Sequence, residues 1–362
     1  MVDISSDDYL TSRRFSPRER AAVLWAEHVA KNTARERDDV FEEVKKHFSD
    51  AELVELTAAG AQFISTNRIH DSLHIPIEDQ SEVDKIKGKV HAEPKLIKAS
   101  IEKLLEYWPN EFPAPAKWVS DAAPITTAAN STKASTGVAS RATSAARVPL
   151  LDPKMAEGAC ASFFDASWRL FGGVSHVVRM WAHIPHVAKF FLPYQAVMAH
   201  DGAGNILPIT LKLMVLVRTG YLNSAAYSLA HRTVAGRAAG ITADQLAALA
   251  GGDCSSSLHF SPRERAALLW ADHIAANTAK RRDDVFDRLK QHYNDAEIVE
   301  LTAVCAMANQ LDRIYNALHL PVEADSDVEA LSGKIQLDPK RVKTYLEMLV
   351  ARWPTEFPIP AD

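Results

Sequence analysis

Residues 296–318, AEIVELTAVCAMANQLDRIYNAL, indicate the fold class of this 362-residue chain. Their apolar side chains recur at the three- and four-residue spacing of a helix that buries one face. The same spacing extends through nearly the whole chain, and we find no convincing run of alternating β-branched residues that would indicate a strand. The sequence therefore predicts an all-α protein.

Local signals for helix ends support this prediction. Ser261 precedes a proline and is followed at the third position by Glu264, and Thr242 is followed in the same way by Gln245. Both patterns are typical of a capping box, in which side chains satisfy the first free N–H groups of a helix. Gly240 follows a helix-like run and suits a left-handed residue at a helix end.

The chain contains an internal repeat with a constant offset of 245 residues. Residues 15–78 and 260–323 match without a gap and share 38 identities in 64 positions. The motif WPNEFP at Trp108 returns as WPTEFP at Trp353. A period this long is far beyond that of a solenoid, so the repeated unit is a domain or half-domain.

The repeat predicts the domain organisation. We name residues 15–117 repeat B and residues 260–362 repeat B′. Residues 118–147 are rich in Ala, Ser and Thr, a composition typical of a flexible linker. Residues 148–253 form a second module, named A, and A with B′ makes one complete domain over residues 148–362.

Composition excludes several classes of protein. The net charge of -5 is mild and provides no basic face for nucleic acid. No apolar stretch reaches the roughly 20 residues of a membrane-spanning helix, and no signal peptide is visible. The cysteines are few, far apart and odd in number, which indicates a reducing compartment. We therefore expect a cytoplasmic protein with no membrane or nucleic-acid partner; its cysteines are Cys160, Cys254 and Cys305.

Residues 211–240, LKLMVLVRTGYLNSAAYSLAHRTVAGRAAG, resemble the signature helix pair of the carboxymuconolactone decarboxylase / alkylhydroperoxidase D-like family. Residues 260–323 resemble the second half of that family's domain. The resemblance implies an all-helical alkylhydroperoxidase D-like domain with an additional duplicated C-terminal half-domain at the N-terminus. It also implies a homo-oligomer based on dimers or trimers. Repeat B lacks its own A, so we expect it to bury its free face on the A–B′ domain, within the chain or across a dimer.

The peroxidase branch of that family carries Cys-x-x-Cys-x-x-x-His with a glutamate upstream. Ser224 and Tyr227 occupy the two cysteine positions here, His231 the histidine and Lys212 the glutamate. Neither replacement forms a disulfide, so the thiol relay is absent. The chain is closer to the decarboxylase-like branch, whose members work without a metal or an organic cofactor, and we expect no cofactor.

Ser224, Tyr227 and His231 are spaced at i, i+3 and i+7, which predicts one helix face, with Asn223 beside them. An imidazole moves protons near neutral pH, and a phenol and a hydroxyl stabilise an oxyanion or orient a substrate. We therefore predict that Ser224, Tyr227 and His231 are catalytic and that Asn223 binds substrate. The alternative is a helix whose polar groups bond within the core.

A second constellation appears where the two repeats diverge. Repeat B′ gains Asn309, Asp312 and Asn316 on one helix face, with Arg313 adjacent. Two interpretations stay open: a substrate-binding pocket wall opposite His231, or drift on a solvent-exposed face.

The leading hypothesis is a cofactor-independent enzyme that transfers a proton on a small carbonyl- or lactone-containing substrate. Decarboxylation, isomerisation, elimination and lactone opening all fit. His231 would move the proton, Tyr227 would donate to the oxyanion, and Arg218 or Arg313 would hold a substrate carboxylate.

Two other functions stay open. A degenerate, non-catalytic family member retained for binding or assembly also lacks the redox residues. A residual peroxidase would need Cys160 or Cys305 beside the histidine. The spacing of His176, His183 and His186 matches no common metal-ligand pattern, so we predict no metal site.

Overall fold

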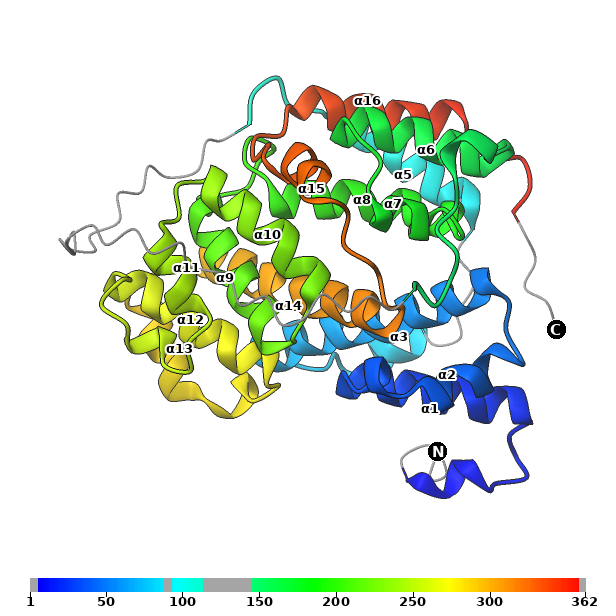
Figure 1. Cartoon of the computed structure of the whole chain (residues 1–362), viewed down its shortest axis with the longest axis horizontal. Helices are drawn as coiled ribbons and strands as arrows, with labels where there is room; N and C mark the ends of the chain where they lie inside the picture. The colour runs from blue at the N-terminus through cyan, green and yellow to red at the C-terminus, as the bar shows by residue number, and fades with distance from the viewer. Residues whose placement is uncertain (1–5, 87–92, 113–144, 358–362) are drawn as a thin grey trace.

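The computed structural model describes residues 6–86, 93–112 and 145–357. Within these ranges the regular structure is helical, and the β contact recorded is a single bridge between Asp201 and Gln336 (Figure 1). The prediction of an all-α protein is confirmed for this part of the chain. Most of the predicted linker, from residue 118 to residue 144, lies outside the described residues.

Each helix of the N-terminal repeat begins 245 residues before a helix of the C-terminal repeat. The N-terminal helices are α1 (Pro17–Lys31), α2 (Asp38–Lys45), α3 (Asp50–Ser72), α4 (Gln80–Ile86) and α5 (Pro94–Glu106). Their C-terminal counterparts are α12 (Pro262–Ala275), α13 (Asp283–Lys290), α14 (Asp295–Ala317), α15 (Asp325–Ser332) and α16 (Pro339–Ala351).

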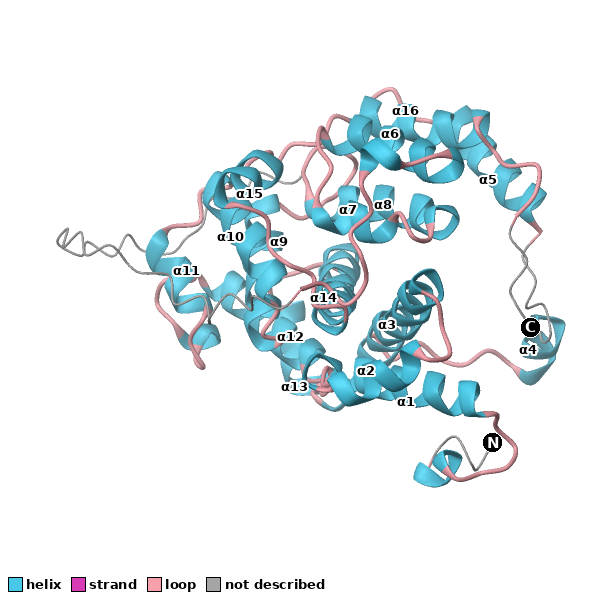
Figure 2. Cartoon of the chain, turned by 45° about the vertical axis from the view of Figure 1, so that its right-hand side comes forward, coloured by secondary structure: helices cyan, strands magenta, loops and turns pink. Residues whose placement is uncertain are grey.

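Module A supplies the helices that cover repeat B′. These are α6 (Gly158–Phe171), α7 (His176–Trp181), α8 (Pro185–Ala199), α9 (Ile209–Leu222), α10 (Ala226–Ala238) and α11 (Ala243–Leu249). Helix α9 packs against α10, α12 and α14 and is buried along most of its length, which explains its nearly continuous apolar sequence. Helix α14 therefore lies at the centre of the molecule (Figure 2).

The predicted helix caps are present. Ser261 Oγ accepts from the Glu264 N–H at 3.2 Å, and the Glu264 carboxylate accepts from the Ser261 N–H at 2.6 Å. Thr242 and Gln245 form the same reciprocal pair at the start of α11. Gly240, just after α10, has a φ of 87°, a left-handed conformation in which a side chain is strained. Each cap stabilises its helix by about 1 kcal/mol.

The two repeats pack against each other through equivalent helices. Helix α3 lies beside α14, and α5 lies beside α16 (Figure 1). The contacts are reciprocal: Arg68 Nε donates to the Ile274 carbonyl at 2.9 Å, and Arg313 Nε donates to the Ala30 carbonyl at 3.3 Å. Since Arg313 stands 245 residues after Arg68, the contact resembles the isologous interface of a two-fold dimer. Repeat B thus packs on repeat B′ within the chain, but the face of α3 that corresponds to the covered face of α14 stays exposed at Phe63.

The histidines that follow α3 and α14 repeat this reciprocity. His74 and His319 have φ values of 48° and 51°, so both stand in the left-handed region directly after a helix. His74 Nε2 lies 3.1 Å from the Lys280 carbonyl, and His319 Nε2 lies 2.8 Å from the Arg35 carbonyl. These side chains therefore join each repeat to its counterpart.

Arg147 joins the end of the linker to both repeats. Its guanidinium donates to the carbonyls of Ala34 and Ala317 and pairs with Asp38, while its side chain is almost fully buried. No described helix has the length and apolar character needed to cross a membrane.

The reciprocal arginines give a matched pair of stability variants. We expect Arg68→Ala to lower the free energy of unfolding by about 1–3 kcal/mol, because it removes the side-chain donor to two carbonyls at the end of α12. Arg313→Ala is expected to cost more, about 3–5 kcal/mol, because it also removes a buried cation from beside Asp312. Denaturant unfolding measures both.

Arg288→Ala is the control, since Arg288 is exposed on α13; a change within about 0.5 kcal/mol is expected there. If Arg68→Ala and Arg313→Ala lowered the free energy of unfolding equally, the additional contribution of the contacts around Arg313 would be contradicted.

Candidate functional site

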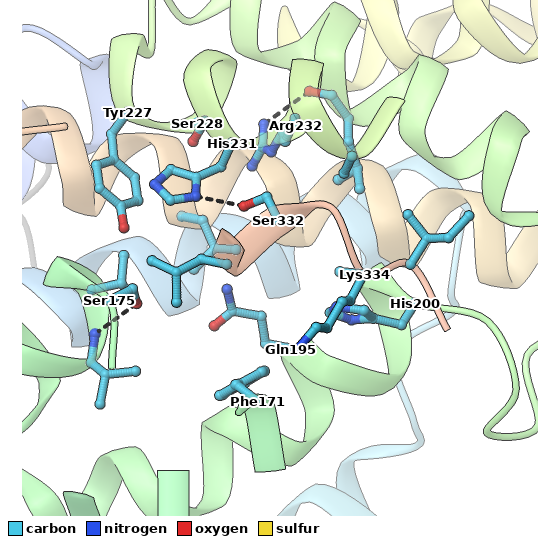
Figure 3. A pocket seen from close by; sticks show the side chains of 18 of the residues that line it. Phe171, Ser175, Gln195, His200, Tyr227, Ser228, His231, Arg232, Ser332 and Lys334 are labelled. Atoms are coloured by element: carbon cyan, nitrogen blue, oxygen red, sulfur yellow. Dashed lines mark hydrogen bonds between the residues drawn. The ribbon is translucent and has the colours of Figure 1, made fainter. Parts of the chain in front are cut away.

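A cavity of about 180 Å³ lies between module A and repeat B′. Its walls come from the end of α6, from α7, α8, α9, α10 and α14, and from the end of α15 with the segment that follows it (Figure 3). Most of the lining is apolar. The polar and charged lining residues are Ser175, Gln195, His200, Tyr227, Ser228, His231, Arg232, Ser332 and Lys334.

His231 stands at the cavity wall with both ring nitrogens engaged. Its Nε2 lies 2.8 Å from Glu323 Oε2, and its Nδ1 lies 2.7 Å from Ser332 Oγ. Helix α10 positions His231, while the loop after α14 supplies Glu323 and the last residue of α15 supplies Ser332. A hydroxyl, an imidazole and a carboxylate thus form one hydrogen-bonded chain. Figure 3 shows its Ser332–His231 part at the cavity.

Glu323 is a buried carboxylate with three donors. Besides His231, Tyr227 OH donates to its Oε1 at 3.0 Å and the His176 N–H donates to the same oxygen at 2.6 Å. Burial alone would raise the pKa of Glu323, but the hydrogen bonds from His231 and from the His176 N–H, together with the imidazole charge, outweigh burial and lower the pKa to about 2. An ionised Glu323 favours the tautomer with the proton on His231 Nε2, which leaves Nδ1 free to accept the Ser332 hydroxyl proton.

Tyr227 lines the cavity one helical turn before His231, with 4.5 Å between the two ring centroids. Burial and the charge of Glu323 raise the pKa of Tyr227 well above its usual value, so the phenol stays protonated. Its single donor is occupied by Glu323. The predicted role of Tyr227 as oxyanion donor does not match this geometry, and the side chain instead positions Glu323.

Ser224 lies outside the predicted array. Helix α10 begins only at Ala226, and Ser224 stands in the preceding turn with a φ of 51° and an exposed side chain. The spacing argument was wrong for this residue because it assumed that the helix had already begun. The cavity instead receives Ser228, whose hydroxyl donates to Asp312 at 2.6 Å.

Asp312 is a fully buried carboxylate that ties α14 to α10 and to the turn before it. It accepts from Asn223 Nδ2 at 2.9 Å and Ser228 Oγ at 2.6 Å, and it pairs with Arg232 Nη2 at 2.9 Å. Asn223, expected to bind substrate, is therefore part of this buried network.

The remaining polar residues of α14 also belong to that network. Arg313 Nη1 donates to Asn309 Oδ1 at 3.0 Å, and Asn316 Nδ2 donates to the Asn223 carbonyl at 2.9 Å. Neither open interpretation of this stretch was right, because these side chains form no cavity wall and most are buried from solvent. The cavity wall from α14 is formed by Met307, Leu311 and Tyr315.

The predicted carboxylate-binding arginines are occupied by the protein itself. Arg218 pairs with Asp272 at 2.6 Å and donates to the carbonyls of Leu249 and Gly251. Arg218 does not line the cavity, and neither does Arg313. Among the described lining residues the cations are Arg232, which Asp312 neutralises, and Lys334, whose side chain is exposed.

Lys212, at the position where the family resemblance implies a glutamate, is fully buried. It donates to the His200 carbonyl at 3.0 Å, and its Nζ lies 3.9 Å from Glu300. Burial lowers the pKa of Lys212 to about 8, against the opposing effect of Glu300.

The described residues contain no group of three or more His, Cys, Asp or Glu side chains placed to hold a metal ion. His176 and His183 each bond a backbone carbonyl, of Pro321 and Pro149. Among the cavity-lining residues of the described chain there is no cysteine.

Sequence reasoning missed Glu323 and Ser332. Glu323 ends the gapless matched stretch 260–323 and is identical to Glu78, but it follows a helix end and periodicity does not place loop residues. Glu78 is exposed, so the repeat alone did not show that one of the two glutamates would face a histidine.

Comparison with known proteins adds little. No protein-family model matches the chain. The uncharacterized protein YdfG of Bacillus subtilis (strain 168) is 28% identical over 111 residues, which cover 30% of this chain and 74% of that protein. Its description names no activity, and the family resemblance stays a prediction.

The low pKa of Glu323 predicts a pH-dependent contribution to stability. Because the folded-state pKa lies below that of an unfolded glutamate, the contribution is present above about pH 4.5 and is lost as the pH falls towards 2. We expect the difference in free energy of unfolding between wild type and Glu323→Gln to be larger at pH 7 than at pH 3, by about 2 kcal/mol.

Glu78→Gln is the matched control, since Glu78 is the exposed counterpart in repeat B. Denaturant unfolding across this pH range measures both variants. A wild-type advantage over Glu323→Gln that stays constant from pH 7 to pH 3 would contradict the prediction.

Proposed function

We propose that this chain is a cofactor-independent enzyme that opens a small lactone or a similar activated carbonyl substrate. The observation that carries the proposal is the hydrogen-bonded chain from Ser332 through His231 to Glu323 at the edge of a cavity. A hydroxyl next to a general base that a carboxylate orients is the arrangement that activates a nucleophile.

The geometry suggests a sequence of proton transfers. His231 Nδ1 removes the Ser332 proton as Oγ attacks the substrate carbonyl, and Glu323 stabilises the imidazolium that forms. The ring C–O bond then breaks, and the leaving oxygen takes the proton back from His231. A water activated by the same imidazole cleaves the acyl–serine bond and frees the opened acid and the Ser332 hydroxyl.

Gln195 is the group best placed to assist the developing oxyanion. Its side-chain amide points into the cavity from α8, on the side that faces Ser332 (Figure 3). Its Oε1 is buried and has no hydrogen-bond partner among the described residues. Since the two ends of an amide exchange by rotation, Gln195 is able to offer an N–H to a substrate oxygen.

The cavity favours a small and mainly apolar substrate. A volume of about 180 Å³ suits a molecule of roughly one ring, comparable to the roughly 150 Å³ cavity that holds benzene. Lys334 is the cation of the lining with no acidic partner among the described residues, so a substrate carboxylate would lie towards it.

The helix order supports the finer family assignment within this proposal. Module A and repeat B′ would form an alkylhydroperoxidase D-like domain, and repeat B would be a duplicated half-domain, because its helices recur at one offset of 245 residues. Assembly into a homo-oligomer and a cytoplasmic location remain part of the proposal.

The two rival functions have weaker support. A peroxidase needs a reactive thiol, but no cysteine lines the described cavity, and burial raises the pKa of both Cys160 and Cys305. Simple proton transfer, as in decarboxylation, uses His231 alone and gives no role to Ser332. A non-catalytic protein requires neither group to react.

Labelling of Ser332 tests the proposal without knowledge of the substrate. We expect a fluorophosphonate to modify wild-type protein once, at Ser332, and labelling to fall about 10²–10⁴-fold in Ser332→Ala and His231→Gln, because both lose base-activated attack. Intact mass and peptide mapping measure the adduct. Ser326→Ala is the control, since Ser326 is exposed on the same helix.

A panel of small lactones supplies the activity readout. Ser332→Ala is expected to lower kcat/KM for ring opening about as much as His231→Gln, and Tyr227→Phe about tenfold, because the phenol only positions Glu323. If Ser332→Ala kept full activity while His231→Gln had none, the reaction would proceed by proton transfer from His231 and not by attack of Ser332. No labelling and no turnover would leave the non-catalytic function.

A further inference from the structure

A second cavity, of about 230 Å³, lies between α6, α8 and α16 and shares no lining residue with the first. Its apolar walls come from Phe163 and Ala166 on α6 and from Met348 and Leu349 on α16. The mechanism proposed above uses none of these residues.

Lys189 on α8 lines this cavity and is only 8% exposed. Its Nζ lies 4.5 Å from the ring centroid of Trp353, 5.1 Å from that of Phe190 and 5.2 Å from that of Phe357. No hydrogen bond or ion pair joins this ammonium to another described residue. Three aromatic faces hold the charge in place by cation–π attraction, but they leave it without an anion.

The other charged groups around the cavity do not neutralise Lys189. His186, one helical turn earlier, also lines the cavity, and burial together with the Lys189 charge lowers its pKa. Arg352 also lines the cavity and pairs with Asp165 at 3.0 Å. Asp165 pairs with Arg169 as well. Apart from the Tyr345 phenol, no other titratable group lines the cavity, and no described carboxylate does.

We propose that this second cavity binds a small monocarboxylate with an apolar body of about one ring. Its carboxylate would pair with Lys189, and its ring would lie between Phe163, Met348 and Leu349. The volume exceeds the roughly 150 Å³ that accommodates benzene. The cavity offers one unpaired lysine among apolar walls, so a single negative charge fits better than a phosphate dianion.

Isothermal titration calorimetry with benzoate tests the proposal on the full-length protein. We expect saturable binding to wild type and no comparable binding of benzamide, which has the same shape and no charge. Lys189→Gln is expected to weaken benzoate binding about tenfold or more, because hydrogen bonds to charged groups contribute strongly to affinity. Lys189→Arg, which retains the charge, is expected to retain more of the affinity than Lys189→Gln.

Two further variants make the result independent of the folding of Lys189→Gln. Ser162→Phe places a ring into the cavity from the half-buried face of α6 and is expected to abolish binding. His231→Gln alters the first cavity alone and is expected to leave benzoate affinity unchanged. Thermal unfolding checks that each variant is folded.

Four outcomes would overturn the proposal. If benzoate failed to bind wild type, the cavity would not be a carboxylate site. If benzamide bound as well as benzoate, the lysine charge would have no role in binding. Benzoate affinity that Ser162→Phe leaves intact would place the ligand elsewhere. A loss of affinity in His231→Gln would move the site to the first cavity.

Discussion

The buried charge of Asp312 constrains the rest of the structure. A carboxylate with no exposed surface is costly unless it is fully paired, and Asp312 meets this requirement with donors from the turn before α10 and from α10 itself. Because Asn223, Ser228 and Arg232 must all reach one side chain of α14, the start and the rotation of α10 are fixed. That rotation points Tyr227 and His231 into the cavity.

The cavity chemistry depends on a second buried carboxylate, Glu323, with a different environment. Asp312 is held by groups of the core, whereas Glu323 is held by the imidazole, by a phenol and by a backbone N–H at the start of α7. Its charge therefore acts on His231 and determines which ring nitrogen is free to accept a proton. Asp312 thus holds α10 against α14, and Glu323 orients the imidazole of His231.

The repeat shows how the same sequence pattern acquires different uses. Arg68 and Arg313 make equivalent contacts across the α3–α14 packing, so both copies serve the interface. Among the described helices, those of module A pack against the helices of repeat B′. Phe63 is accordingly 69% exposed, whereas its counterpart Ala308 is completely buried. Repeat B′ therefore lines a cavity because module A packs over it, and not because of the sequence that the two repeats share.

The sequence by itself determined the helical class, the start of α12 at its Ser261 cap, the pairing of repeat elements and the presence of His231 and Tyr227 on one helix face. These features follow from periodicity and from hydrogen bonds between neighbours in the chain, which one stretch of residues contains completely. Only the tertiary structure decided that Ser332 and Glu323 meet His231, that Ser224 stands outside, and that the polar face of α14 joins a buried network with Asn223. Such contacts join residues about a hundred positions apart, and their formation depends on which helix covers which, a property that no local pattern contains.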